Sequence, residues 1–82
     1  MKTIATWEYT DTFGREANYA WVKRGEIELP ETIKTGEIVR LVKRDAGLTG
    51  VRMIRQEYGD MIELRPVGIC AVLFITFEQI SE

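Results

Sequence analysis

The segment 69–77, with the sequence ICAVLFITF, has no polar side chain before Thr76 and constrains the fold more than any other feature. Successive side chains of a strand point to opposite faces of its sheet, so this strand would be apolar on both faces. Such strands lie in the middle of a sheet with both faces covered. We therefore expect segment 69–77 to be a central strand.

Segments 3–10 and 18–24 alternate in the way of half-buried strands, and turn-forming residues separate them. The segment 25–30 extends the second strand as far as Pro30, which cannot donate to a sheet. A hairpin is predicted, with Tyr9 opposite Tyr19 as one register. It would place four aromatic residues on one face, namely Trp7, Tyr9, Tyr19 and Trp21.

The remaining segments predict one helix and a second hairpin. Apolar residues from Ile38 to Ala46 recur at helical spacing, and Gly47 is expected to end the helix. Segments 51–58 and 61–66 flank Gly59-Asp60, a two-residue loop that places Tyr58 opposite Met61. The expected fold is α+β: one domain over residues 1–82, a mostly antiparallel sheet of about five strands in the order ββαβββ, and one helix packed on one face.

A single helix covers only one face of this sheet, which leaves the second side of the last strand unshielded. Val72 and Phe74 lie on that side, where an apolar patch in water is costly. A homodimer or a protein partner would cover them. We therefore predict Val72 and Phe74 as the dimer interface.

The residue types present exclude most catalytic chemistry. The chain has no histidine, which removes imidazole as a base or metal ligand, and its one serine, Ser81, stands one residue from the end. Its one cysteine, Cys70, cannot form an internal disulfide and is expected to be a small buried hydrophobe. The prediction is a protein that is not an enzyme and has no catalytic residues, metal or cofactor.

The net charge and the hydropathy of the sequence limit the kinds of partner that we expect. The formal net charge is −2 and basic residues are spread along the chain, which ranks nucleic acid below protein as a partner. No signal-like start is present, and the longest apolar run is about half of what a membrane-spanning helix needs. A cytoplasmic protein without a membrane partner is expected.

Two sequence features suit binding. The aromatic set of Trp7, Tyr9, Tyr19 and Trp21 would anchor a partner if exposed, although aromatic residues at strand spacing also pack in cores. An acidic cluster stands at the end of the second strand and would imitate nucleic-acid phosphates to a cationic channel, although such clusters are often solvated edges. It consists of Glu26, Glu28 and Glu31.

Four stretches resemble a group of small proteins from bacterial and phage genomes, and the match covers most of the chain. They are YTDTFG (9–14), EANYAWV (16–22), AGLTGVR (46–52) and YGD (58–60). The group has no assigned catalytic residues, so the resemblance implies a mobile-element setting and no site. As a class, small acidic phage proteins without catalytic apparatus resemble anti-CRISPR and other anti-defence inhibitors, which occupy a surface on a host complex.

The sequence thus favours a small non-catalytic protein-binding module, expected to inhibit a host defence or nucleic-acid-handling complex. The partner-binding residues predicted for it are the aromatic set and the acidic cluster. The alternative is a single-stranded nucleic-acid-binding protein that stacks bases on an aromatic sheet face. In that alternative Lys23, Arg24, Arg52 and Arg55 would meet the phosphate backbone.

Overall fold

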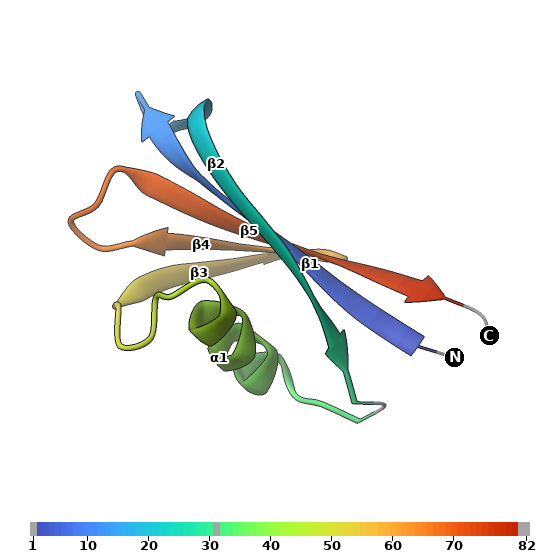
Figure 1. The fold of residues 1–82 in the computed structure, drawn as a ribbon. Coiled ribbons are helices and arrows are strands. Elements are labelled where there is room, and N and C mark those ends of the chain that lie inside the picture. Colours follow the sequence, from blue (N-terminus) through green and yellow to red (C-terminus); the bar gives the residue numbers. More distant parts are fainter. Residues whose placement is uncertain (1, 31, 81–82) are drawn as a thin grey trace.

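The computed structural model describes residues 2–30 and 32–80 and shows one five-stranded antiparallel sheet with a helix against it (Figure 1). The strands are β1 (Lys2–Phe13), β2 (Glu16–Leu29), β3 (Met53–Tyr58), β4 (Met61–Pro66) and β5 (Ala71–Ile80), and the helix is α1 (Thr35–Asp45). The order across the sheet is β2-β1-β5-β4-β3. The expected α+β class and the order ββαβββ are confirmed.

The apolar strand β5 lies at the centre of the sheet, as its composition predicted. It pairs with β1 on one side and with β4 on the other. The strand begins at Ala71 and not at Ile69, because a turn with Gly68 at φ +79° precedes it. Cys70 belongs to this turn and is exposed, so the expectation of a buried cysteine is wrong.

The hairpin of β3 and β4 has the predicted register. Tyr58 pairs with Met61 and Arg55 pairs with Leu64. Gly59 has φ +64°, a left-handed conformation that side chains with a Cβ rarely adopt. The short loop therefore fixes which side chains of β4 face the helix, and Ile62 and Leu64 are both buried there.

The register of β1 and β2 differs from the predicted one. Tyr9 pairs with Lys23 and not with Tyr19. Pairing shifts between Thr10 and Thr12, where Asp11 alone of β1 stands opposite the segment 18–21 of β2. Such a bulge lets one strand carry extra residues without losing its partner. Its consequence is that the four aromatic residues do not share a face.

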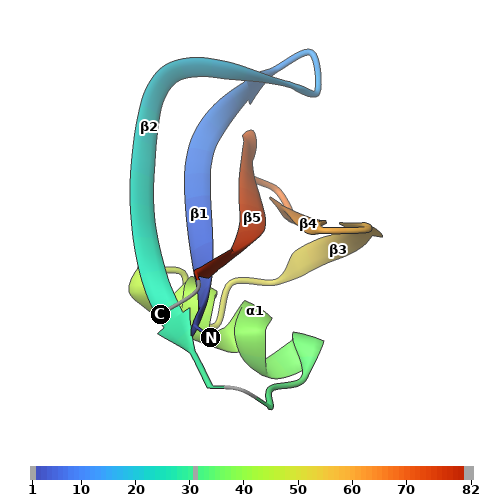
Figure 2. The same cartoon turned by 90° about the vertical axis from the view of Figure 1, so that its right-hand side faces the viewer.

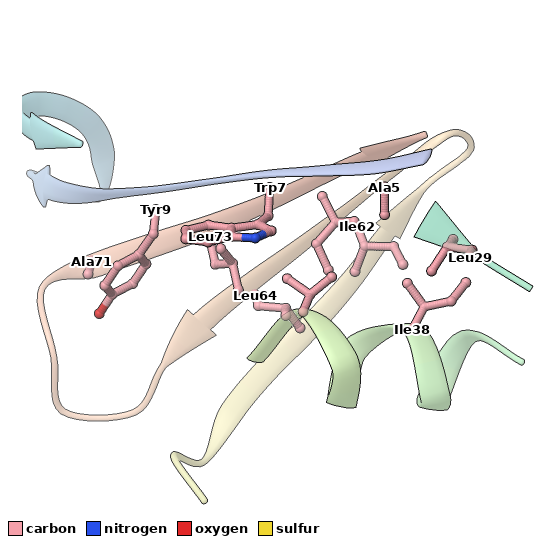
Figure 3. Close-up of a cluster of buried hydrophobic side chains, with 11 residues drawn as sticks. Ala5, Trp7, Tyr9, Leu29, Ile38, Ile62, Leu64, Ala71 and Leu73 are labelled. Carbon is pink, nitrogen blue, oxygen red and sulfur yellow. The ribbon is translucent and has the colours of Figure 1, made fainter. Parts of the chain in front are cut away.

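The core lies between α1 and the face of the sheet turned toward it. Figure 2 shows β3 and β4 set at a steep angle to β1 and β2, with α1 in the space between the two halves. From the helix Ile38 and Val42 are buried, and they belong to one apolar cluster with strand residues that include Leu64 and Leu73. Figure 3 shows Ile38 beside Leu29 of β2. The sheet wraps its apolar face around a helix of 11 residues, which is how one short helix closes this core.

Helix α1 ends where Gly47 was expected to end it. Gly47 has φ +76°, and its N–H donates to the Arg44 carbonyl oxygen at 3.2 Å. The N–H of Leu48 donates to the Lys43 carbonyl oxygen at 2.7 Å, and the Leu48 side chain packs against the core. These two bonds and the apolar contact form the Schellman motif, which satisfies the last carbonyl groups of the helix.

Trp7 joins the sheet to the helix. It pairs with Gly25 of β2, and a Cβ atom at Gly25 would lie 2.5 Å from the indole Nε1. The indole therefore occupies the space that a side chain at position 25 would need. From there Nε1 donates to Oδ2 of Asp45, the last residue of α1, at 2.7 Å.

We expect Gly25→Ala to destabilise the protein by about 1 to 3 kcal/mol, because the methyl group displaces the Trp7 ring and strains its bond to Asp45. Gly36→Ala is the matched control, since no atom lies within 4 Å of a Cβ at this helical position. It should stabilise by about 0.5 to 1 kcal/mol through helix propensity. Urea unfolding measures both, and equal midpoints for the two variants would contradict this account of Trp7.

Leu73→Ala should destabilise the protein by about 2 to 5 kcal/mol, because Leu73 is fully buried in the central strand and its truncation leaves a cavity. Leu41→Ala removes the same atoms from a half-buried position on the helix and should cost less. Thermal or urea unfolding gives the order of the two, and a larger cost at Leu41 would place the core elsewhere.

Candidate protein-interaction face

The face of the sheet turned away from α1 carries no helix within the described residues, and we call it the open face. Residues paired in register lie on the same face, so the pairings define its rows. One row runs from Glu28 through Ile4 to Glu78, and the next from Glu26 through Thr6 and Thr76 to Met61. A third row consists of Arg24, Glu8, Phe74, Glu63 and Gln56.

Glutamates dominate the charge of the open face. Its acidic residues are Glu8, Glu26, Glu28, Glu63 and Glu78, and the arginines in its rows are Arg24 and Arg65. Arg15, from the turn after β1, borders the face beside Gln56, Glu63 and Arg65. Arg24 and Arg65 are already matched on the face, because Arg24 Nε lies 2.8 Å from Glu8 and Arg65 lies 3.1 Å from Glu63. Within the described part of the chain, no ion pair involves Glu26 or Glu78. The open face therefore presents negative charge to solvent.

The bulge of β2 folds against the open face at Thr10. Thr10 is fully buried, and its Oγ1 donates to the Trp21 carbonyl oxygen at 2.8 Å and accepts the Tyr19 N–H at 3.1 Å. The Asp11 carboxylate accepts the Ala20 N–H and the Asn18 Nδ2, both at 2.9 Å. Side chains of β1 thus replace the backbone partners that the bulged residues lose.

These bonds affect the titration of Asp11. The pKa of Asp11 lies below its ordinary value of 3.8, mainly because the Asn18 side chain donates to its charged form. The N–H of Ala20 lowers the pKa further, while partial loss of solvent opposes the shift. The ionised carboxylate is therefore the form that holds the bulge.

The bulge places Tyr19 at φ +56°, which is rare for a residue with a large side chain. Tyr19 then borders a shallow depression of about 300 Å³ on the open face. The other residues around this depression are Thr6, Glu8, Met61, Phe74 and Thr76. A hydrogen bond from Arg24 lowers the pKa of Glu8, with a smaller contribution from Tyr19, and interaction with Glu8 raises the pKa of Tyr19.

The predicted aromatic set is divided between core and surface. Trp7 and Tyr9 are buried on the helix side of the sheet, so neither side chain is exposed to a partner. Trp21 is partly exposed, and its ring packs edge-on against Tyr9 with the ring centroids 5.2 Å apart. Only Tyr19 borders the depression on the open face. The expectation of one aromatic face is wrong, because the bulge shifts the alternation of β2.

The predicted acidic cluster lies in part on the open face. Glu26 and Glu28 are exposed there, opposite Thr6 and Ile4, while Glu31 is outside the described residues. The structure adds Glu78 and Glu63, which belong to other strands and were not singled out by the sequence. Register across the sheet brings these side chains together, and no local sequence pattern carries that information.

The proposed dimer residues differ in their exposure. Val72 is fully buried within one chain, and it pairs with Thr10, the residue against which the bulge folds. Its burial therefore requires no second copy. Phe74 is half-buried and borders the depression. Of the predicted pair, only Phe74 is available to a partner.

Positive charge gathers on the opposite side of the molecule. A groove of about 390 Å³ follows the outer surface of α1 and the loop after it. Its lining includes Arg40, Lys43 and Arg44 and no acidic residue. Lys43 Nζ donates to the Val51 carbonyl oxygen at 2.6 Å, which holds the loop to the helix. This basic groove and the open face thus lie on different sides of one small protein.

Within residues 2–30 and 32–80, no three side chains of the types that bind metals come together, and no helix has the length and apolar character needed to cross a membrane. Comparison of the chain with protein-family models, with curated proteins and with solved structures gives no match. Conclusions about function therefore rest on the open face itself.

We expect the bulge to loosen in acid. The pKa of Asp11 is lowered in the folded chain, so its ionised carboxylate stabilises the folded bulge. This stabilisation is complete above the ordinary pKa of 3.8 and is lost as the pH falls from 3.8 through the lower pKa of the folded chain. Hydrogen exchange at the Ala20 amide should accelerate, relative to its intrinsic rate, as Asp11 protonates. Asp11→Ala should show the fast relative rate at every pH. An Ala20 amide that is equally protected in both proteins would exclude this role.

Proposed function

We propose that the chain is a non-catalytic protein-binding module whose open face binds a cationic surface of another protein. The observation that carries this proposal is the surplus of glutamates on a sheet face that no helix covers. Glu26 and Glu78 are exposed and lie on strands at either side of β1. Complementary charge steers such a face toward a basic partner and disfavours acidic ones.

A basic surface of this kind is typical of proteins that handle nucleic acids, whose channels bind phosphates through arginine and lysine. A small acidic face that occupies such a channel would compete with the nucleic acid. This is the mode expected of an inhibitor of a host defence complex, of the anti-CRISPR class. The resemblance to small phage and bacterial proteins is consistent with that setting and does not depend on the charge of the open face.

Direct binding of single-stranded nucleic acid has less support. Base stacking requires exposed aromatic rings beside cations. Trp7 and Tyr9 are buried on the helix side of the sheet, and the face that carries Tyr19 is acidic. Lys23 and Arg24 are neighbours in β2 and therefore point to opposite faces, Lys23 opposite Tyr9 and Arg24 opposite Glu8.

The test is affinity capture from a bacterial lysate, compared between the wild type and the double variant Glu26→Lys, Glu78→Lys. We expect the wild type to retain basic nucleic-acid-handling proteins and the variant to lose them. The folded state should be unaffected, since exposed charges contribute little to stability. Thermal unfolding of both proteins checks that assumption.

The matched control is Glu16→Lys, Glu57→Lys, which changes the net charge equally. Glu16 stands near the tip of the first hairpin and Glu57 lies on the helix side of the sheet, opposite Ile62. Capture should persist in this control and should be reduced by added DNA. Equal capture by all three proteins would refute the proposal. Direct, strongly salt-dependent binding of an oligonucleotide to the purified chain would favour the rival function.

A further inference from the structure

The depression beside Tyr19 brings together charged, aromatic and sulfur-containing side chains on the open face. Glu8 and Phe74 are paired neighbours, and Thr6, Thr76 and Met61 form the adjoining row. Tyr19 joins them from the bulge. A carboxylate, two aromatic rings and a thioether thus surround one shallow space of about 300 Å³.

The conformation of Tyr19 indicates that its position is specified. A bulky residue at φ +56° is strained, and such strain persists only where the surroundings enforce it. Here the surroundings are Thr10 and Asp11, which bind the backbone of residues 19–21. A glycine would fit this conformation without strain, yet the position carries a large aromatic ring that is half exposed.

We propose that this depression binds the guanidinium group of an arginine side chain supplied by the partner protein. The carboxylate of Glu8 offers charge-assisted hydrogen bonds, and aromatic faces attract cations. Guanidinium is planar and weakly hydrated, so it stacks on aromatic rings more readily than the compact ammonium of lysine. The surrounding glutamates strengthen the local negative potential.

The chain already shows how Glu8 binds such a group. Arg24 donates from Nε to one carboxylate oxygen, Oε2, at 2.8 Å, while Arg24 itself is 63% exposed. Arg24 is not among the residues that border the depression, so the space beside Tyr19 and Phe74 stays open. A second guanidinium that enters this space would share the Glu8 carboxylate with Arg24 and with Tyr19, whose side chain also interacts with it.

This inference rests on the proposed function, because it names the side chain that the open face would recognise. Its test uses small probes and no partner protein, so the arginine site and the proposed function can fail separately. The full chain is labelled with ¹⁵N and titrated at low salt with N-acetyl-arginine-N-methylamide. The citrulline derivative, which is a neutral isostere, and the corresponding lysine derivative serve as comparison probes.

We expect saturable shifts of the amide signals of Thr6, Tyr19 and Thr76 with the arginine probe, and binding weaker by about tenfold or more with citrulline. The lysine probe should bind more weakly than arginine. Shifts confined to the helix side, or equal binding of citrulline, would overturn the proposal. Equal binding of lysine would overturn the assignment to guanidinium.

Two substitutions separate the depression from the general charge of the face. Glu8→Gln should weaken binding of the arginine probe by about tenfold. Glu78→Gln removes the same charge outside the depression and should change the affinity for this probe by less than about twofold. Tyr19→Gly should also abolish binding while leaving the thermal midpoint no lower than that of the wild type, since glycine relieves the strain. Retained binding in Tyr19→Gly would contradict the proposal.

Discussion

The contact of Trp7 with Gly25 and Asp45 holds the two layers of this protein together. The indole needs the space left by the missing Cβ of Gly25, and from that position its N–H reaches the last residue of α1. One side chain therefore connects the edge strand β2, the strand β1 and the helix. With so short a helix, the core depends on such a fixed docking point, because a small domain buries little apolar surface in total.

The bulge has the corresponding role on the other face. Thr10 and Asp11 supply hydrogen bonds that the backbone ladder cannot make there, and the extra residues of β2 fold toward the open face. Val72, the partner of Thr10 in β5, is fully buried next to this arrangement, and Tyr19 borders the depression. The position of Tyr19 beside the depression is thus a consequence of this irregularity.

The elements set by local patterns could be predicted from the sequence. The helix end follows from Gly47, the second hairpin from Gly59, and the central place of β5 from its composition. The register of β1 and β2 could not be predicted, because it depends on side chains that replace backbone partners at Thr10 and Asp11. The open face could not be predicted either, because Glu63 and Glu78 lie on one face with Glu26 only through the order of the strands. Local clusters are visible in a sequence, whereas rows across a sheet are not.

The bulge also bears on how the chain avoids sticking to itself. Strand β2 is 14 residues long and lies at the edge of the sheet, where its outer backbone groups have no neighbouring strand. A long, regular edge is a template for pairing with another edge, and proteins that aggregate often do so in this way. The bulge interrupts this edge, and the charged side chains along β2 make strand addition less favourable. The irregularity that shapes the open face therefore also protects the protein against uncontrolled sheet extension.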